Sequence, residues 1–214
     1  MQELTIGLHH FQALPQRALY WPAQSMLLLA DLHLGKTDSF RQLGVGVPHS
    51  MQQQDLVRLR NLLDLCAPQR CVVLGDFVHG PTLHATTQNA WNTLVTHYPD
   101  TRFELVLGNH DRAFNPERLT VHAIHQFLQI QDVLLSHEPL PDTAWHADLM
   151  LNIYGHLHPA VQVIGSAKKL PALIWQPPYL CLPAFSEFTA GVSAPGTYKS
   201  IWVFVEEAEV IQIR

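Results

Sequence analysis

Five short motifs, far apart along the chain, contain the residue types that bind divalent metal ions. They are Asp31-Leu32-His33, Gly75-Asp76-Phe77-Val78-His79, Gly108-Asn109-His110-Asp111, Ser136-His137-Glu138 and Gly155-His156-Leu157-His158. Carboxylates, amides and imidazoles are the oxygen and nitrogen donors that first-row divalent ions accept. Two such ions bound side by side can clamp and polarise a phosphoryl group. The set therefore predicts a phosphoesterase with a two-metal site.

Each motif alone is weak. An isolated Asp-x-His or Gly-Asn-His-Asp is more often a turn, because Asn, Asp and Gly suit turns. Gly-His-Leu-His alone could be a strand end with two solvated histidines. Four of the five motifs, however, directly follow an apolar, strand-like run. Five independent turns would not be expected in this arrangement, so the combination favours a metal site.

The elements that must position these motifs alternate in the first half of the chain. Strands are predicted at 25–30, 70–74 and 102–107, and helices at 48–66 and 83–98. The first of these strands is a continuous apolar run, as expected of a strand buried on both faces. The motifs of Asp31, Asp76 and Asn109 follow the three strands. Open α/β sheets place ligands at such carboxyl ends.

The second half changes character. Strands with few helices between them are predicted at 132–135, 149–154, 160–164, 172–176, 179–182 and 200–213. A helical half followed by a strand-rich half predicts two packed sheets flanked by helices. The length of 214 residues fits one domain, 1–214, with a full hydrophobic core.

Composition narrows the class of protein. Hydrophobic residues make up 47% and charged residues 14% of the chain, as in a globular protein. The longest apolar run falls short of the ~18 residues of a membrane span, and the first residues lack the features of a signal peptide. We therefore expect a cytoplasmic protein that does not insert into membranes. The net charge of -5 argues against a general polyanion binder, although two bound cations would reverse the local sign.

The order and content of the motifs resemble the calcineurin-like metallophosphoesterase superfamily. This resemblance implies its α/β fold, a four-layer α/β/β/α sandwich with two mixed sheets. It implies two ions ~3.5–4 Å apart that share a hydroxide, which attacks phosphorus in line with the leaving oxygen. It also implies two ligand sets bridged by Asp76: Asp31, His33, Asp76 and His158 for one ion, and Asp76, Asn109, His137 and His156 for the other.

Two further histidines have implied catalytic roles. His110, next to Asn109, matches the position that protonates the leaving group, a step that contributes ~10²–10⁴-fold. The residue three after the bridging aspartate is a second aspartate in the phosphoprotein phosphatases of the superfamily, but here it is His79. Gly-Asp-x-x-His instead resembles the double-strand-break repair nucleases. This difference favours a nucleic-acid phosphodiester over a phosphoprotein.

Other segments resemble one bacterial branch of the superfamily, the ligase-associated DNA-damage-response endonucleases often called PdeM. These segments are Asp31-Leu32-His33-Leu34-Gly35-Lys36, Phe40-Arg41, Gly44-Val45-Gly46-Val47-Pro48 and Leu182-Pro183-Ala184-Phe185-Ser186-Glu187-Phe188-Thr189-Ala190-Gly191. The branch is grouped functionally with a DNA ligase, a helicase and an exonuclease. The resemblance implies a DNA endonuclease or phosphodiesterase with two divalent ions, expected to be manganese, with iron, zinc or magnesium as alternatives.

Three basic residues near the ligands are candidates for substrate phosphate contacts: Lys36, Arg41 and Arg112. Arginine suits bidentate phosphate contact and lysine acts as a point charge. The competing interpretation is that they pair with local carboxylates.

Two other functions remain open at this point. The same metal core would serve a small-molecule phosphodiesterase acting on cyclic nucleotides or nucleoside polyphosphates. An inactive, metal-binding accessory subunit of a repair complex is less favoured, because such proteins usually lack ligands or the acid, and all are present here.

Overall fold

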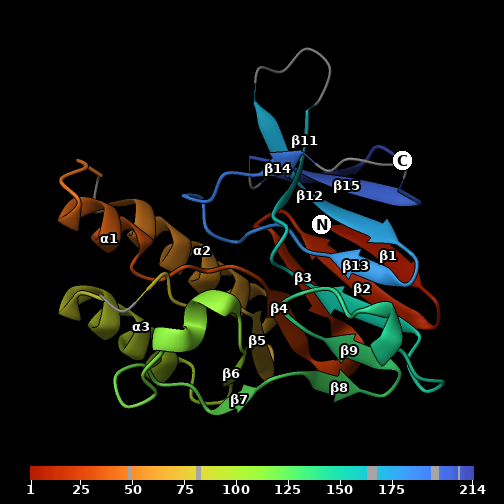
Figure 1. Cartoon of the computed structure of the whole chain (residues 1–214), viewed down its shortest axis with the longest axis horizontal. Coiled ribbons are helices and arrows are strands. Elements are labelled where there is room, and N and C mark those ends of the chain that lie inside the picture. Colours follow the sequence, from red (N-terminus) through yellow and green to blue (C-terminus); the bar gives the residue numbers. More distant parts are fainter. Residues whose placement is uncertain (48–49, 81–82, 163–167, 194–197, 207) are drawn as a thin grey trace.

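The computed structural model describes residues 1–47, 50–80, 83–162, 168–193, 198–206 and 208–214. Two β-sheets pack against each other, and helices cover the outer face of the first sheet (Figure 1). The first sheet is antiparallel from β1 to β4 and parallel from β4 to β7. Its strands, in spatial order, are β1 (Gln2–Ile6), β2 (His9–Leu14), β3 (Ala18–Trp21), β4 (Met26–Leu29), β5 (Arg70–Leu74), β6 (Arg102–Val106) and β7 (Ala123–His125).

The second sheet is also mixed. Its central strands β9, β10 and β13 run parallel, while β12 pairs antiparallel with β11, β13 and β15. The strands are β8 (Leu128–Ile130), β9 (Val133–Leu135), β10 (Leu151–Tyr154), β11 (Pro159–Gln162), β12 (Lys169–Gln176), β13 (Tyr179–Cys181), β14 (Val192–Ser193), β15 (Ser200–Val205) and β16 (Glu209–Gln212).

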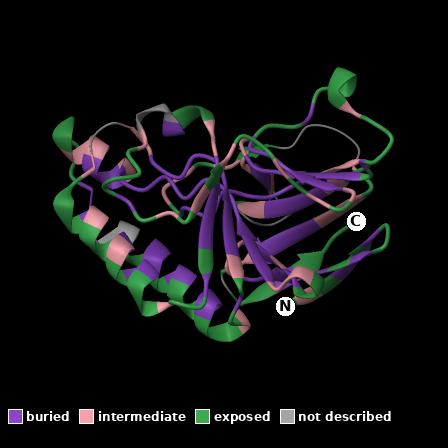
Figure 2. Ribbon diagram, turned by 90° about the horizontal axis from the view of Figure 1, so that it is seen from below, coloured by how far each residue is buried: buried purple, intermediate pink, exposed green. Residues whose placement is uncertain are grey.

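Three α-helices are described, α1 (Lys36–Gln42), α2 (Ser50–Cys66) and α3 (Ala85–His97), with short 3-10 helices η1 (Pro22–Gln24), η2 (Asn109–Ala113) and η3 (Asp142–Ala144). Helices α2 and α3 bury Leu59, Leu63 and Trp91 against the first sheet. Their outward faces are exposed and their inward faces are buried (Figure 2). This is the two-sided pattern of helices that cover a sheet.

Apolar side chains fill the space between the two sheets. Leu28, Val72 and Leu74 of the first sheet meet Leu135 and Ile153 of the second, and each is 0% exposed. The carboxyl ends of β4, β5, β9 and β10 are therefore fixed against each other by a dry core. This packing places the loops that follow these strands at one common edge.

The prediction of an α/β fold with two mixed sheets is confirmed. The strand predicted at 70–74 has those bounds, and the predicted helices correspond to α2 and α3, although residues 48 and 49 lie outside the described part. The predicted strand 160–164 is described only as far as Gln162, and 200–213 is a hairpin of β15 and β16. In the described residues, loops and η3 cover the outer face of the second sheet at Leu134, Leu140 and Leu149, where the four-layer sandwich would place α-helices.

The first three strands were not predicted, although the apolar Leu4 and Ile6 of β1 and Phe11 and Ala13 of β2 alternate with polar residues and are buried. The three cysteines are free thiols: Cys71 and Cys181 are buried and Cys66 is half-buried. Among the described helices, none is long and apolar enough to span a membrane.

Candidate metal centre

The candidate ligands lie just beyond the carboxyl ends of parallel strands. They follow β4, β5 and β6 of the first sheet and β9 and β10 of the second; in chain order they are Asp31, His33, Asp76, Asn109, His137, His156 and His158. Carboxyl ends of parallel strands share an edge, where α/β proteins bind ligands. The structure brings together all seven ligands that the sequence predicts.

Their donor atoms form two groups that share Asp76. Within each group, one nitrogen or carboxylate oxygen per residue lies within 4.8 Å of the others. The first group is Asp31, His33, Asp76 and His158, and the second is Asp76, His137 and His156. Asn109 joins the second group, since its Oδ1 lies 2.9 Å from His137 Nε2. The shared carboxylate is what a bridge between two ions requires.

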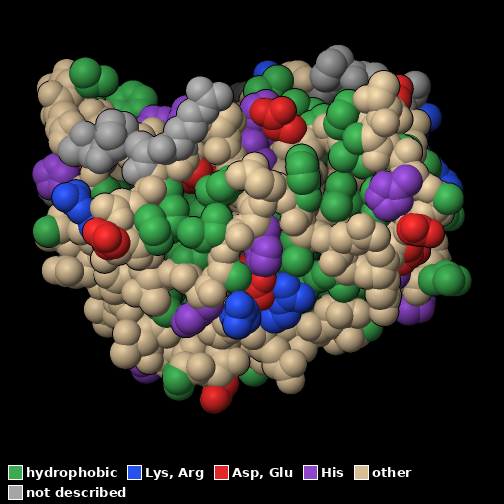
Figure 3. Space-filling view, turned by 60° about the horizontal axis from the view of Figure 1, so that its bottom comes forward, with side chains coloured by type: hydrophobic (Ala, Val, Ile, Leu, Met, Phe, Trp, Pro, Cys, Tyr) green, Lys and Arg blue, Asp and Glu red, His purple; other side chains and the backbone are tan. Residues whose placement is uncertain are grey.

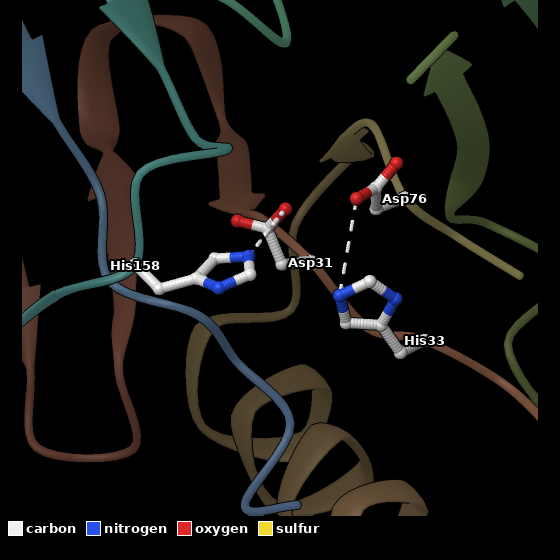
Figure 4. Close-up of side chains that lie close together, drawn as sticks. All are labelled: Asp31, His33, Asp76 and His158. Atoms are coloured by element: carbon white, nitrogen blue, oxygen red, sulfur yellow. Dashed lines mark ion pairs between the residues drawn. The ribbon is translucent and has the colours of Figure 1, made fainter. Parts of the chain in front are cut away.

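The first group is drawn in Figure 4. His158 Nε2 lies 3.2 Å from Asp31 Oδ1, and His33 Nε2 lies 3.9 Å from Asp76 Oδ2. In the second group, His137 Nε2 lies 3.4 Å from Asp76 Oδ1. These side chains converge from both sheets on one small volume, and all four in Figure 4 except His158 are buried.

The backbone at the ligands is in the left-handed region, which side chains other than glycine rarely adopt. The φ angles of Asp31, His33, Asp76, His156 and His158 are 56°, 49°, 48°, 65° and 46°. On an extended strand, Asp31 and His33 would point to the same face but lie about 7 Å apart. Both can therefore approach one ion only if the chain bends sharply. The positive φ values provide that bend. Such strain is found where the surrounding fold holds a functional site in place.

Three glycines that precede ligands each lie against another ligand. A Cβ on Gly75 would lie 2.1 Å from His137 Nδ1, on Gly108 2.5 Å from Asp76 Oδ1, and on Gly155 2.9 Å from Asp31 Oδ2. A Cβ at any of these distances would overlap its neighbour. Only glycine, which has no Cβ, therefore allows the two loops to approach so closely. The glycines of the motifs therefore permit the close packing of one ligand loop on the next.

Backbone groups orient the ligands. The amide of His156 donates to Asp31 Oδ2 at 3.1 Å, and the amide of His110 donates to Asp76 Oδ1 at 3.0 Å. His137 Nδ1 lies 3.1 Å from the carbonyl oxygen of Leu74, a hydrogen bond that places the ring proton on Nδ1 and leaves Nε2 for a metal. Each contact fixes one donor atom and directs another toward the shared volume.

The electrostatics of the site fit a cation. Asp31 Oδ1, both ring nitrogens of His33 and His158 Nε2 are buried without a hydrogen-bond partner. Unpaired buried polar atoms are costly, and a metal ion would satisfy them. Burial lowers the pKa of His33 to about 2, with further contributions from Lys36 and neighbouring imidazoles. His33 is therefore neutral, the form that binds metal ions.

Comparison with known proteins identifies the family. A sequence model of the calcineurin-like phosphoesterases matches residues 25–162, which include all seven candidate ligands. The chain belongs to the calcineurin-like phosphoesterase family. It is accordingly a metal-dependent phosphoesterase. The family uses a divalent metal centre, and the two groups described above are the candidate metal-binding residues of this chain.

Solved structures include a close relative of this phosphoesterase. The crystal structure of the Pseudomonas putida nuclease MPE is 27% identical, covers 99% of both chains and superimposes with a TM-score of 0.83. A protein of unknown function from Aquifex aeolicus, AQ665, is 20% identical over 66% of this chain and 82% of its own, with a TM-score of 0.45. The Escherichia coli phosphoesterase Yfce is 16% identical over 88% and 97%, with a TM-score of 0.48. No curated protein sequence matches this chain.

The two candidate catalytic histidines of the phosphoesterase lie beside the first ligand group. The rings of His79 and His110 are stacked, with centroids 5.4 Å apart and planes 15° apart. His110 is 42% exposed, and its Nε2 lies 4.0 Å from Asp76 Oδ2. Burial, with Lys36 and His110 nearby, lowers the pKa of His79 to about 4. His110 can thus reach a substrate, while His79 is the more enclosed of the two.

The three candidate phosphate contacts differ in their surroundings. Lys36 lies near the centre: burial lowers the pKa of its amine, and the charges of Asp31 and Asp76 oppose that effect. Its Nζ donates to Thr189 Oγ1 at 3.0 Å. Arg41 instead pairs with Asp38 and donates to the carbonyl of Val47, so its guanidinium makes contacts within α1 and with the segment that follows it. The Arg112 side chain lies outside the described part of the structure.

Asp111 completes the Gly-Asn-His-Asp motif but had no predicted role. Its Oδ1 accepts from the amide of Val78 at 3.0 Å and its Oδ2 from the amide of Gly108 at 2.9 Å. Burial raises its pKa to about 6. One carboxylate thus holds the loop of Asp76 against the loop of Asn109. Its place in the motif was the signal that could have identified it.

A buried arginine, also without a predicted role, supports the first ligand loop. Arg58, 2% exposed on α2, pairs with Asp55 at 2.6 Å and Glu187 at 3.2 Å and donates to the carbonyl of Phe185. The amide of Ser186 in turn donates to the carbonyl of Asp31 at 3.2 Å. The segment 184–187 therefore links α2 to the first ligand. This contact gives a structural reason for the motif at 182–191.

Proposed function

We propose that this phosphoesterase hydrolyses phosphodiester bonds in DNA. The observation that carries the proposal is its similarity over 99% of both chains to the Pseudomonas putida nuclease MPE. The His79 that follows Asp76 by three residues supports it, since the phosphoprotein phosphatases carry an aspartate there. The resemblance of four segments to the ligase-associated endonucleases supports a role in DNA repair beside a ligase, a helicase and an exonuclease.

The proposed ligands are the two groups that share Asp76. Asp31, His33, Asp76 and His158 would hold one ion, and Asp76, Asn109, His137 and His156 would hold the other. Two divalent ions held there supply Lewis-acid chemistry that activates water and neutralises phosphate charge. Histidine and carboxylate donors suit manganese, the expected metal, and also iron and zinc.

The proposed general acid is His110. Its exposed ring stands beside Asp76 and can donate a proton to the leaving oxygen of a substrate. The stacked ring of His79 fixes the plane of His110. Burial lowers the pKa of His79 to about 4, so the ring of His79 is neutral and does not itself serve as a proton donor. His79 is therefore a positioning residue for His110.

Lys36 is the proposed contact to substrate phosphate. Thr189 holds its amine near Asp31 and Asp76, where a phosphate bound at the metal centre would lie. The test variant is Lys36→Met, which keeps the length of the side chain and removes its charge. Lys199→Met is the matched control, because Lys199 is exposed on another part of the molecule.

A small-molecule phosphodiesterase is the second candidate, and the charge of the protein favours it. The net charge is -5. On the face drawn in Figure 3, basic side chains form a small cluster mixed with acidic and histidine side chains and otherwise lie scattered. A chain with so few basic groups would make only about two to four phosphate contacts outside the scissile one. DNA binding should therefore be weak unless a partner delivers the DNA.

A substrate panel with manganese separates the two candidates. It comprises single-stranded, duplex, nicked and branched DNA, RNA, cyclic nucleotides and bis-p-nitrophenyl phosphate. For DNA, the logarithm of affinity should fall with the logarithm of salt concentration, with a slope of about -0.7 per contact on single strands. Lys36→Met should reduce DNA cleavage more than cleavage of the nitrophenyl diester, and Lys199→Met should change neither. Two results would together favour the small-molecule phosphodiesterase: DNA cleavage that does not change with salt concentration, and an equal loss of activity of Lys36→Met on DNA and on the nitrophenyl diester.

A further inference from the structure

A cavity of ≈ 350 Å³ opens beside the second ligand group. It is lined by Asn109 and His137 of that group together with Leu107, Gly108, Asp111, Gln126, Phe127 and Glu138. Phe127 is 60% exposed, and its aromatic ring is a large apolar surface to leave open to water next to a metal centre. The proposed general acid and Lys36 belong to the other side of the site. None of the roles assigned so far uses this cavity.

The short loop that carries the exposed ring of Phe127 is anchored at both ends. Gln126 and Phe127 connect β7, at the edge of the first sheet, with β8, at the edge of the second. Before the loop, the amide of Leu107 donates to the carbonyl of His125 at 2.9 Å, and the His125 ring contacts Glu104 at 2.8 Å. After it, Leu128 pairs with Leu135 across β8 and β9. The loop thus presents the ring from a fixed frame, as a binding platform requires.

The charge of the cavity indicates what it can accept. The Glu138 carboxylate lines it, and among the described lining residues none is a lysine or an arginine. A second phosphate would be repelled there. A neutral planar group would gain contact with the ring of Phe127 and could hydrogen bond to Gln126 and Glu138. Nucleobases have such a flat face and polar edges, and they stack on aromatic side chains in single-strand binding proteins.

We propose that this cavity binds a nucleobase adjacent to the scissile phosphate, stacked on Phe127. The cavity is continuous with Asn109 and His137, so a phosphate at the metal centre places a neighbouring nucleoside within reach of it. This inference rests on the proposed function, that the substrate is a nucleic acid. The proposed stacking adds a contact that depends on the presence of a base rather than on the charge of the backbone.

The test combines changes in the protein with changes in the substrate. The manganese-loaded enzyme is given a single-stranded oligonucleotide with one hydrolysable linkage, and versions in which the base 5′ or 3′ of that linkage is replaced by an abasic residue. Phe127→Ala should raise KM for the intact oligonucleotide by about fivefold or more, the loss expected from one stacked base. Phe127→Tyr keeps the ring and should retain the KM of the unchanged enzyme. Ile124→Ala, an exposed residue of β7 that does not line the cavity, is the control.

On one of the two abasic substrates, the difference between the unchanged enzyme and Phe127→Ala should disappear. A 2-aminopurine base at the same position should be quenched on binding to the unchanged enzyme and to Phe127→Tyr, but not to Phe127→Ala. Equal KM values for the unchanged enzyme and Phe127→Ala on the intact oligonucleotide, or a loss that persists on both abasic substrates, would overturn the inference and leave DNA cleavage intact. An enzyme that cleaves a small diester but neither binds nor cleaves the oligonucleotide would overturn the proposed function as well.

Discussion

The amide of His156 donates a hydrogen bond to Asp31 Oδ2 at 3.1 Å, across 125 residues of sequence. This contact joins the first and the last candidate ligand motifs, which follow strands of different sheets. It also assigns one carboxylate oxygen to the backbone and leaves Oδ1, which is buried without a hydrogen-bond partner, for a cation. The ligand geometry is therefore built into the fold of the protein chain.

Replacement of the shared carboxylate should remove metal. Asp76→Asn keeps the size of the side chain but removes the negative charge from between two cations. We expect bound metal to fall from two ions toward one or none, with loss of activity, measured by elemental analysis of the purified protein. Asp100→Asn, an exposed aspartate in the turn before β6, should keep both ions. Two tightly bound ions in Asp76→Asn would remove the basis for the two-group assignment.

Loss of the proposed general acid should depend on the leaving group. His110→Ala should retain metal yet lose about 100-fold or more in turnover on DNA, because an alkoxide leaving group needs a proton. The loss should shrink on a nitrophenyl ester, whose leaving group needs little protonation. His79→Ala should show a milder form of the same pattern. Equal losses of His110→Ala on both substrates would mean that His110 binds or positions the substrate.

The effect of the close contact between Gly75 and His137 on stability and metal content can be measured separately from the effect of backbone strain. Gly75→Ala places a Cβ 2.1 Å from His137 Nδ1 at a φ of 75°, so both the free energy of unfolding and the metal content should fall. Gly7 has a similar φ of 61° with nothing within 4 Å. Gly7→Ala should therefore cost only the backbone strain, about 1–2 kcal/mol, and keep the metal. Equal effects in urea unfolding and metal analysis would show that strain alone explains Gly75.

Removal of the buried guanidinium should destabilise the fold. Arg58→Ala leaves the Asp55 carboxylate, 4% exposed, without its cationic partner, and breaking a buried pair costs about 3–5 kcal/mol. Urea unfolding measures this loss. Arg60→Ala, an exposed position on the same helix, should change the free energy of unfolding by about 0.5 kcal/mol or less. A small effect at Arg58 would show that the segment 184–187 is held by other contacts.

An ion-pair cluster on β6 should make stability depend on acid pH. Burial alone would raise the pKa of Glu104, but hydrogen bonds from Arg70 and His125 outweigh it and hold that pKa below its ordinary value of 4.5. The pair's contribution to stability is therefore complete above pH 4.5 and is lost as the pH falls through the lower, folded-state pKa. Glu104→Gln should lower the free energy of unfolding at pH 7 and flatten its decline below pH 4.5. The exposed Glu117→Gln should leave both unchanged.

The sequence pointed to the candidate ligands more readily than to the residues that support them. Metal ions accept only particular residue types, so Asp31, Asp76 and His137 could be named as candidates from their motifs, and the structure brings them together. Arg58 and Asp111 could not, because an arginine on an amphipathic helix and an aspartate in a turn are usually solvated. Their roles depend on partners more than 30 residues away, Glu187 for Arg58 and Val78 for Asp111. Phe127 was missed because a lone phenylalanine normally belongs to a core.

The segment 184–187 has a consequence for the order in which the protein matures. The family match ends at residue 162, yet Asp31 is held by the amide of Ser186 and Lys36 by Thr189. During synthesis, Asp31 of the first ligand loop is made 155 residues before its support Ser186. A nascent chain that stops short of these residues lacks the contacts that fix its first ligand. Tight metal loading should accordingly begin only after residues 186–189 have left the ribosome.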